Sequence, residues 1–106
     1  MKITQISVFL ENQPGRLTLA AKTLADANID IRTLSLADTS DFGILRLLLD
    51  EPERGLSILE KANFTVKATE VVAVEVPDSP GGLAKVLGTI AQAQVSIEYM
   101  YAYTRP

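Results

Sequence analysis

The 106-residue sequence contains no cysteine, no histidine and no tryptophan. Without cysteine the chain forms no disulfide bond and no thiolate metal site, and without histidine it lacks the commonest neutral metal ligand and general base. It also lacks the Gly-x-Ser-x-Gly pattern of an activated serine nucleophile. We therefore expect a protein that is not an enzyme and needs no cofactor or metal, although a pair of carboxylates remains an open route to catalysis.

Clustered positive charge and long apolar runs are also missing. The 10 basic residues are scattered among 13 acidic ones, and the net charge is −3, whereas proteins that bind nucleic acid concentrate Lys and Arg on one face. The apolar runs, such as Leu47–Leu49, are far shorter than the roughly 20 residues of a membrane-spanning helix. The beginning of the chain lacks the apolar core of a signal peptide. A cytoplasmic protein without nucleic-acid or membrane partners is expected.

The hydrophobic pattern predicts one complete small α+β domain over residues 1–70. Apolar residues make up 47% of the sequence, which is enough to bury a core. Their periodicity predicts a strand at 3–10, a helix at 15–28, a strand at 29–37, a turn at 39–43, a strand at 43–50, a helix from Pro52 and a strand at 64–70. This order is typical of a ferredoxin-like βαββαβ sandwich, in which two helices cover one face of a four-stranded antiparallel sheet.

Two local patterns predict how these elements pack. In the first strand Ile6, Val8 and Leu10 alternate with Ser7 and Phe9, so the two sets face opposite sides of the sheet. The Leu-rich run at 43–50 suits a strand in the middle of the sheet. The apolar stripe of the first helix is formed by residues at helical spacing, namely Leu17, Ala20, Ala21, Leu24 and Asn28.

Part of the sequence is repeated. "LENQPGRL" at 10–17 returns as "VPDSPGGL" at 76–83, so that Gly81 follows Gly15 by 66 residues. The same offset aligns further identical residues, among them Val8 with Val74, Thr23 with Thr89, Ala27 with Ala93 and Ile31 with Ile97. Such an internal repeat predicts a second domain of the same kind.

The second copy is predicted to be incomplete. Residues 71–106 contain only the first half of a domain, a strand, a helix and the strand "VSIEYMYAYT" at 95–104. Half a unit cannot close its own core. We expect a truncated or partly ordered form of a chain about 30 residues longer, and we prefer this to the alternative that a second subunit supplies the missing cover.

The strand-to-helix corner suits an anion. The first amides of a helix have no intrahelical acceptor and lie at the positive end of the helix dipole, so Gly15, Arg16 and Leu17 are candidates to bind a carboxylate. Pro14 sets the entry angle of the helix, and Asn12 offers both an acceptor for an ammonium group and a donor for a carboxylate. Together these groups suit a free α-amino acid.

The alternative is that the corner is only a turn, because Asn, Pro and Gly form turns without any ligand. The duplication favours a ligand. Asp78, Pro80, Gly81 and Gly82 rebuild the corner in a copy whose other surface positions have diverged.

The stretch "LENQPGRLTLAAKTLADANIDI" followed by a ferredoxin-like remainder resembles the ACT domain, the small-molecule-sensing module of many enzymes of amino-acid metabolism. The similarity extends over residues 3–103 and is greatest to tandem ACT proteins and the regulatory subunit of acetolactate synthase. It implies that ligands bind between paired units. The family's polar ligand positions correspond to Asn12 and Asp30 in the first copy and to Asp78 and Ser96 in the second.

The chain departs from the serine-sensing members of this family. Leu10 and Val76 stand where those proteins have His, and Asp30 stands where they have Asn. This argues against serine. An Asp at position 30 can still pair with an ammonium group, and Leu10 suits a pocket for an apolar side chain.

We therefore expect an amino-acid-binding regulatory module that acts allosterically at interfaces between ACT units, as a homodimer or a higher homo-oligomer. An amino-acid biosynthetic enzyme is the expected partner. Phe9, Leu34 and Tyr101 are expected on an exposed face of the sheet. Because such an apolar face needs to be covered, it favours a dimer. A dimerisation module without a ligand is the main alternative. The alternating Tyr99, Tyr101 and Tyr103 resemble a base-stacking platform, but an interface explains them more simply in a chain without clustered basic residues.

Overall fold

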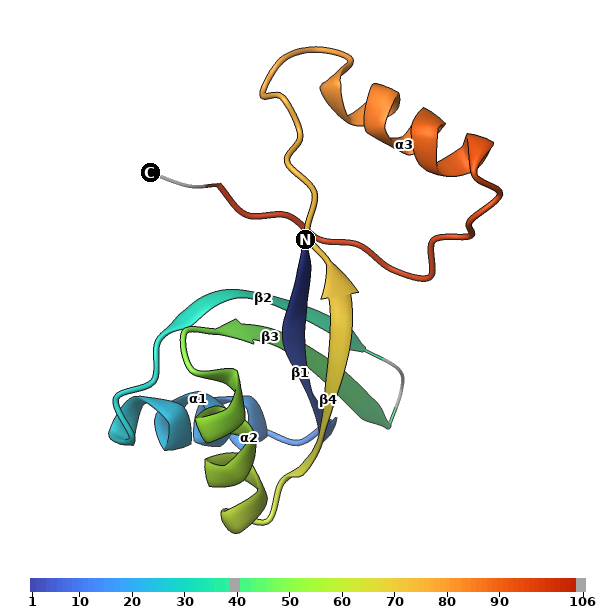
Figure 1. Cartoon of the computed structure of the whole chain (residues 1–106). Helices are drawn as coiled ribbons and strands as arrows, with labels where there is room; N and C mark the ends of the chain where they lie inside the picture. Colours follow the sequence, from blue (N-terminus) through green and yellow to red (C-terminus); the bar gives the residue numbers. More distant parts are fainter. Residues whose placement is uncertain (39–40, 105–106) are drawn as a thin grey trace. The chain divides into compact units, whose positions relative to one another are not determined.

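The computed structural model describes residues 1–38 and 41–104, which form two compact units. One unit is Lys2–Val71, and the other joins Met1 to the chain from Val72 onward. Figure 1 shows the elements in chain order, which are β1 (Lys2–Glu11), α1 (Arg16–Asp26), β2 (Ile31–Asp38), β3 (Phe42–Leu49), α2 (Pro52–Lys61), β4 (Thr65–Val72) and α3 (Gly82–Gln92).

The first unit has the predicted α+β architecture. Its four strands form one sheet in the order β2-β3-β1-β4, and α1 and α2 lie together on one face of it (Figure 1). The Leu-rich strand β3 pairs antiparallel with both β1 and β2, which confirms its expected central place. Of the predicted turn at 39–43, residues 39 and 40 lie outside the described part of the chain.

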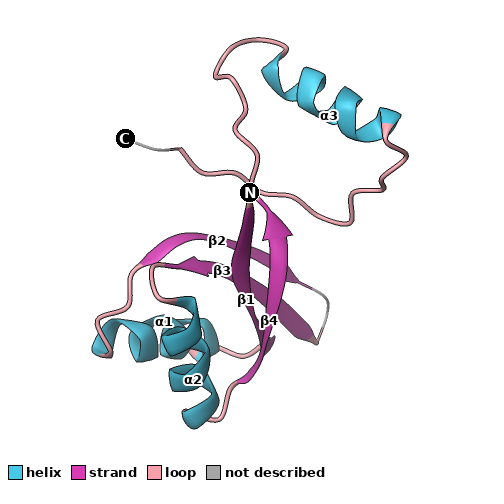
Figure 2. Ribbon diagram, viewed as in Figure 1, coloured by secondary structure: helices cyan, strands magenta, loops and turns pink. Residues whose placement is uncertain are grey.

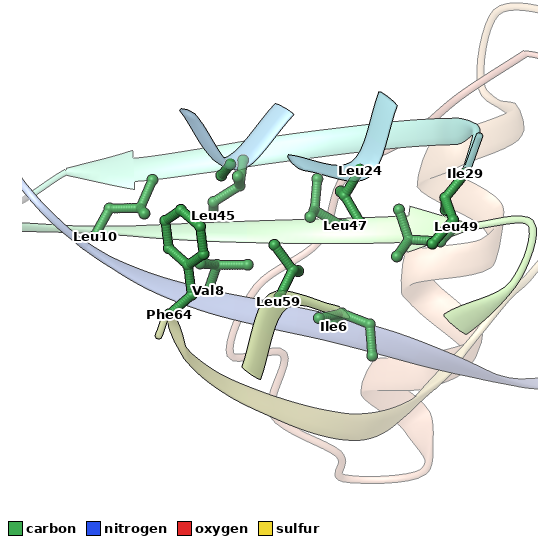
Figure 3. Packing of buried hydrophobic residues seen from close by; sticks show 11 residues of the cluster. Ile6, Val8, Leu10, Leu24, Ile29, Leu45, Leu47, Leu49, Leu59 and Phe64 are labelled. Atoms are coloured by element: carbon green, nitrogen blue, oxygen red, sulfur yellow. The ribbon is translucent and has the colours of Figure 1, made fainter. Parts of the chain in front are cut away.

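The core lies between the sheet and the two helices. Ile6, Val8 and Leu10 of β1 are at most 4% exposed, and Ile6 lies opposite Leu47 of β3. Figure 3 shows how these side chains meet those of the helices, including Leu24 of α1 and Leu59 of α2. The predicted inward face of β1 is thus confirmed.

Two predictions about apolar residues are wrong. The stripe predicted for α1 is too wide: Leu17 is 44% exposed, Ala21 and Asn28 are exposed too, and only Ala20 and Leu24 are buried in this helix. Leu34 does not share a sheet face with Phe9. Residues that lie opposite each other in a ladder point to the same side, and Leu34 lies opposite Leu47, on the helix-covered face at the outer strand β2.

Close packing explains a glycine inside α2. A Cβ atom added at Gly55 would overlap the Cδ1 atom of Leu49 and touch the Cδ2 atom of Leu24 at 3.6 Å. Gly is unfavourable inside a helix, but here its missing side chain lets α2 approach β3 and α1. Helix propensity alone does not reveal such a contact.

The second unit contains α3 between two irregular segments (Figure 2). The predicted strand at 95–104 is not formed, and residues 73–77 have no regular structure either. A strand is stabilised by a hydrogen-bonded neighbour, and within the described residues no strand ladder reaches either segment. Ala73 exchanges backbone hydrogen bonds with Met1, at 2.8 and 3.2 Å.

The repeat is visible in the backbone of the two corners and their helices. Gly15 and Gly81 both have φ of 89°, in the left-handed region that favours glycine. About two turns into each helix a threonine hydroxyl donates to the carbonyl four residues earlier, from Thr23 at 2.7 Å and from Thr89 at 3.2 Å.

All three helices also end in the same way. The residues just beyond their C-terminal caps, Asn28, Asn63 and Gln94, have φ of 58°, 69° and 59°. The amide of the next residue donates back to a carbonyl in the last turn, from Ile29 to Leu24 and from Phe64 to Leu59 at 3.0 Å, and from Val95 to Ile90 at 3.4 Å. This is the Schellman arrangement, and it usually has Gly where these helices have Asn or Gln.

Candidate functional site

The first corner leaves three amides without an acceptor. Gly15 caps α1, its carbonyl accepts from the amide of Leu19 at 2.9 Å, and no side chain caps the helix. The amides of Gly15, Leu17 and Thr18 have no acceptor among the described residues. The amide of Arg16 does not belong to this set, contrary to prediction, because it donates to the carbonyl of Gln13 at 3.3 Å within the turn.

The side chain of Arg16 packs on the protein itself. Its guanidinium carbon lies 4.9 Å from the centroid of the Phe64 ring, a cation–π distance. The Nε atom is buried and has no hydrogen-bond partner in the described part of the chain. Arg16 therefore anchors the start of α1 against the residue that precedes β4.

A hollow of about 510 Å³ adjoins the residues that lead into the corner. It is lined by Glu11, Asn12, Gln13, Asp41 and Phe42. The amide of Asn12 donates to the carbonyl of Asp41 at 3.1 Å, which ties the corner to the strand that follows the β2–β3 turn. Of these five residues only Asn12 was predicted as a ligand residue, because the pairing of Glu11 with Phe42 depends on the sheet register and leaves no local signal.

Asp30 lies at the other end of the sheet. Glu11 pairs with Phe42 at one end of β3, while Ile31, next to Asp30, pairs with Leu49 at the other end. Seven residues of strand separate the two ends by about 23 Å. The exposed Asp30 carboxylate lies 3.4 Å from the Arg32 Nε. Asp30 and Asn12 of one unit therefore cannot contact the same small molecule.

The second corner repeats the pattern of unused amides. Gly82 donates to the carbonyl of Ser79 at 3.0 Å, as Arg16 does to Gln13. The amides of Gly81, Leu83 and Ala84 have no acceptor within the described residues. Position 82 requires glycine for a steric reason, because a Cβ atom there would overlap the carbonyl of Pro77.

The remaining predicted positions of the second copy are exposed. Asp78 and Ser96 have no hydrogen bond or ion pair within residues 1–38 and 41–104, and Ser96 lies in the irregular segment after α3. Across the same residues, no group of three or more acidic side chains lies close enough to hold a metal ion. No described helix has the length and apolar character needed to span a membrane.

Comparisons with solved structures place this fold among known ones. Protein BT0572 from Bacteroides thetaiotaomicron is 43% identical, superposes with a TM-score of 0.93, and the match covers 99% of this chain and 73% of that one. The ligand-free regulatory subunit of aspartate kinase from Thermus thermophilus is 18% identical with a TM-score of 0.67, over 94% of this chain and 76% of that one.

A third similar structure contains aspartokinase alpha and beta subunits, with 18% identity, a TM-score of 0.52 and coverage of 96% and 80%. At this identity the two kinase structures show a shared fold alone. A search of curated proteins gives no match. The model of the ACT domain pair matches residues 1–105. The chain belongs to the ACT domain family.

Proposed function

We propose that this protein is a regulatory module that binds a small amino acid at interfaces between ACT units. The observation that carries the proposal is the set of unused amides at the start of α1, on Gly15, Leu17 and Thr18. Amides at a helix N-terminus attract a carboxylate through both hydrogen bonds and the helix dipole.

The hollow beside the corner suits the rest of an amino acid. Asn12 is exposed there, and its side chain both donates and accepts hydrogen bonds. Glu11 and Asp41 add carboxylates that favour an ammonium group. One α-amino acid carries both charges, so it matches the donors of the corner and the acceptors of the hollow.

The position of Asp30 supports a ligand that lies between two units. A two-fold axis beside the outer strand β2 sets two copies of that strand antiparallel, which brings the Asp30 end of one copy to the corner end of the other. Leu34 and Leu36 of β2 are 55% and 49% exposed, so this edge offers apolar surface for such contact. A ligand that touches both copies stabilises the paired state and thereby couples its concentration to assembly.

The regulated partner would be an enzyme of amino-acid metabolism in the cytoplasm. One similar structure is named as a regulatory subunit of aspartate kinase. The resemblance of the sequence to the regulatory subunit of acetolactate synthase makes that enzyme a second candidate partner. Neither enzyme is fixed by the residues of the corner.

Thermal shift with each of the twenty amino acids tests the proposal. A true ligand raises the melting temperature, and its stabilisation grows with the logarithm of the ratio of ligand concentration to the dissociation constant. We expect Asn12→Ala and Asp30→Ala to reduce the shift, and Glu60→Ala, a change at an exposed residue of α2, to leave it unchanged. If no amino acid raises the melting temperature while the protein still forms dimers, the protein is a dimerisation module without a ligand.

A further inference from the structure

The backbone of Asp30 is held by a single residue, Asp50, through two hydrogen bonds. The amide of Asp50 donates to the carbonyl of Asp30 at 3.1 Å, and the amide of Asp30 donates to the Asp50 Oδ1 atom at 3.0 Å. Asp50 follows directly after the last residue of β3. Both polar backbone groups of Asp30 are therefore fixed by a residue that is distant in sequence.

The second of these hydrogen bonds differs from those of a regular strand ladder. In an antiparallel ladder, paired residues exchange hydrogen bonds between backbone groups alone. Here the acceptor for the Asp30 amide is the carboxylate of Asp50. An ionised acceptor makes a stronger hydrogen bond than a neutral carbonyl does. The hold on Asp30 therefore depends on the side chain at position 50.

The ladder is also irregular just after Asp30. While β2 advances by two residues, from Ile31 to Thr33, its partner β3 advances by only one. Such a β-bulge bends the strand and re-aims the side chains beside it. Arg32 lies within the bulge, and its Nε atom is 3.4 Å from the Asp30 carboxylate. Because both side chains are more than half exposed, this ion pair alone does not fix the carboxylate.

The turn that leads to Asp30 is fastened by the helix that follows Asp50. Arg54 of α2 donates from Nη2 to the carbonyl of Ala27 at 2.6 Å. Its Nη1 atom donates to Glu51 at 3.1 Å, which holds the guanidinium in place. Ala27 is the C-terminal cap of α1. Residues 50–54 thus hold the connection between α1 and β2 at two points, Ala27 and Asp30.

Buried neighbours provide a rigid base for both aspartates. Ile29 directly precedes Asp30 and is 5% exposed, and Leu49 directly precedes Asp50 and is 8% exposed. Figure 3 shows Ile29 and Leu49 at the same end of the core. The side chain of Asp30 itself is 72% exposed. An exposed acid on a backbone that is fixed in advance loses little conformational freedom when a ligand binds.

We propose that Asp50 is a positioning residue for the amino-acid site. It holds the backbone of Asp30 so that the Asp30 carboxylate meets the ammonium group of an amino acid bound at the corner of a second copy. This inference rests on the proposed function and adds a residue that acts through Asp30 without touching the ligand. The role requires an acceptor oxygen at position 50 and no negative charge.

Calorimetric titration tests this role, with the amino acid that most raises the melting temperature of the wild type. Asp50→Ala removes the acceptor and is expected to weaken binding about tenfold. Because Asp50 is exposed, this variant is expected to stay folded. Asp50→Asn keeps an acceptor oxygen and is expected to bind within about twofold of the wild type. Asp26→Ala, which removes an exposed aspartate paired with Lys22, is the matched control and should leave the affinity unchanged.

A double-mutant cycle separates positioning from a general structural role. If Asp50 acts through Asp30, Asp50→Ala causes no further loss of affinity in a chain that already carries Asp30→Ala. Each single variant should then lose about tenfold, and so should the double variant.

Three outcomes overturn the inference while the proposed function stands. They are losses that multiply to about 100-fold in the double variant, an Asp30→Ala variant that binds as tightly as the wild type, and an Asp50→Asn variant as weak as Asp50→Ala. If no amino acid binds the wild type, the proposed function fails, and this inference fails with it.

Discussion

Two stretches of this chain, 15–29 and 81–95, have the same local backbone but differ in burial. Both turn through a left-handed glycine into a helix that ends in the same Schellman turn. Yet Ile29 is 5% exposed, and its counterpart Val95, 66 residues later, is 59% exposed. The comparison shows that neighbouring residues determine the backbone conformation of a turn and a helix, whereas burial of their side chains requires a surrounding sheet. Turns and helices form locally, whereas strands and a core require partners that are distant in sequence.

The largest expected difference between the stretches is in their core residues. Leu24→Ala should lower the free energy of unfolding by about 3 kcal/mol, because it opens a cavity in a buried cluster. Ile90→Ala at the equivalent site should cost less than about 1 kcal/mol at concentrations where the chain is monomeric. Urea unfolding of both variants measures this. Equal losses would show that α3 has a buried partner in the monomer.

The next contrast concerns glycines inside helices. Gly55→Ala should destabilise the first unit by about 1–3 kcal/mol, since the added methyl group overlaps Leu49. Nothing lies within 4 Å of a Cβ atom at Gly88 in α3, so Gly88→Ala should stabilise that helix by up to about 1 kcal/mol. Circular dichroism during thermal unfolding reports both changes. A stabilising Gly55→Ala would contradict the close packing of α2.

At the two corners the same substitution should have the same local cost. Gly15→Ala and Gly81→Ala each force alanine to φ near 89°, and open space surrounds both sites, so only backbone strain of about 1–2 kcal/mol is expected. The first should lower the melting temperature of the core, and the second should reduce the helix content of α3. If Gly81→Ala is neutral, the left-handed corner does not persist in the second stretch.

The smallest effects are expected at the helix ends. Gln94→Gly should stabilise the end of α3 by about 0.5–1 kcal/mol, because glutamine is poorly suited to φ of 59°. Asn28→Gly should change stability by only a few tenths of a kcal/mol, since asparagine tolerates this conformation well. Chemical denaturation of the two variants measures these changes in stability. A larger stabilisation by Asn28→Gly than by Gln94→Gly would contradict the expected order.

Much of the first unit could be predicted because its signals are local. The alternation of apolar residues in β1 correctly predicted that Ile6, Val8 and Leu10 face the core. The Leu-rich run correctly predicted the central place of β3 in the sheet. The glycine of each corner followed from the turn itself. Helix positions were right to within a few residues, since periodicity blurs at helix ends.

What could not be predicted depends on contacts between distant residues. The need for glycine at position 55 comes from Leu49 and Leu24, and the separation of Asp30 from Asn12 comes from the register of β3 with two neighbours. The amide of Arg16 is occupied by a turn whose geometry the sequence did not specify. The segment at 95–104 has a strand-like pattern but no strand, because pattern alone supplies no partner.

The central position of β3 has a consequence for amide hydrogen exchange. Its amides are bonded between two neighbouring strands and shielded by leucines, so they should exchange only when the whole first unit opens. The amides of α3 lie on a single exposed helix and should exchange through brief local opening. In one deuterium time course, the exchange rates of the β3 amides would therefore report the global stability of the first unit. Those of the α3 amides would report local opening of the helix in the second unit.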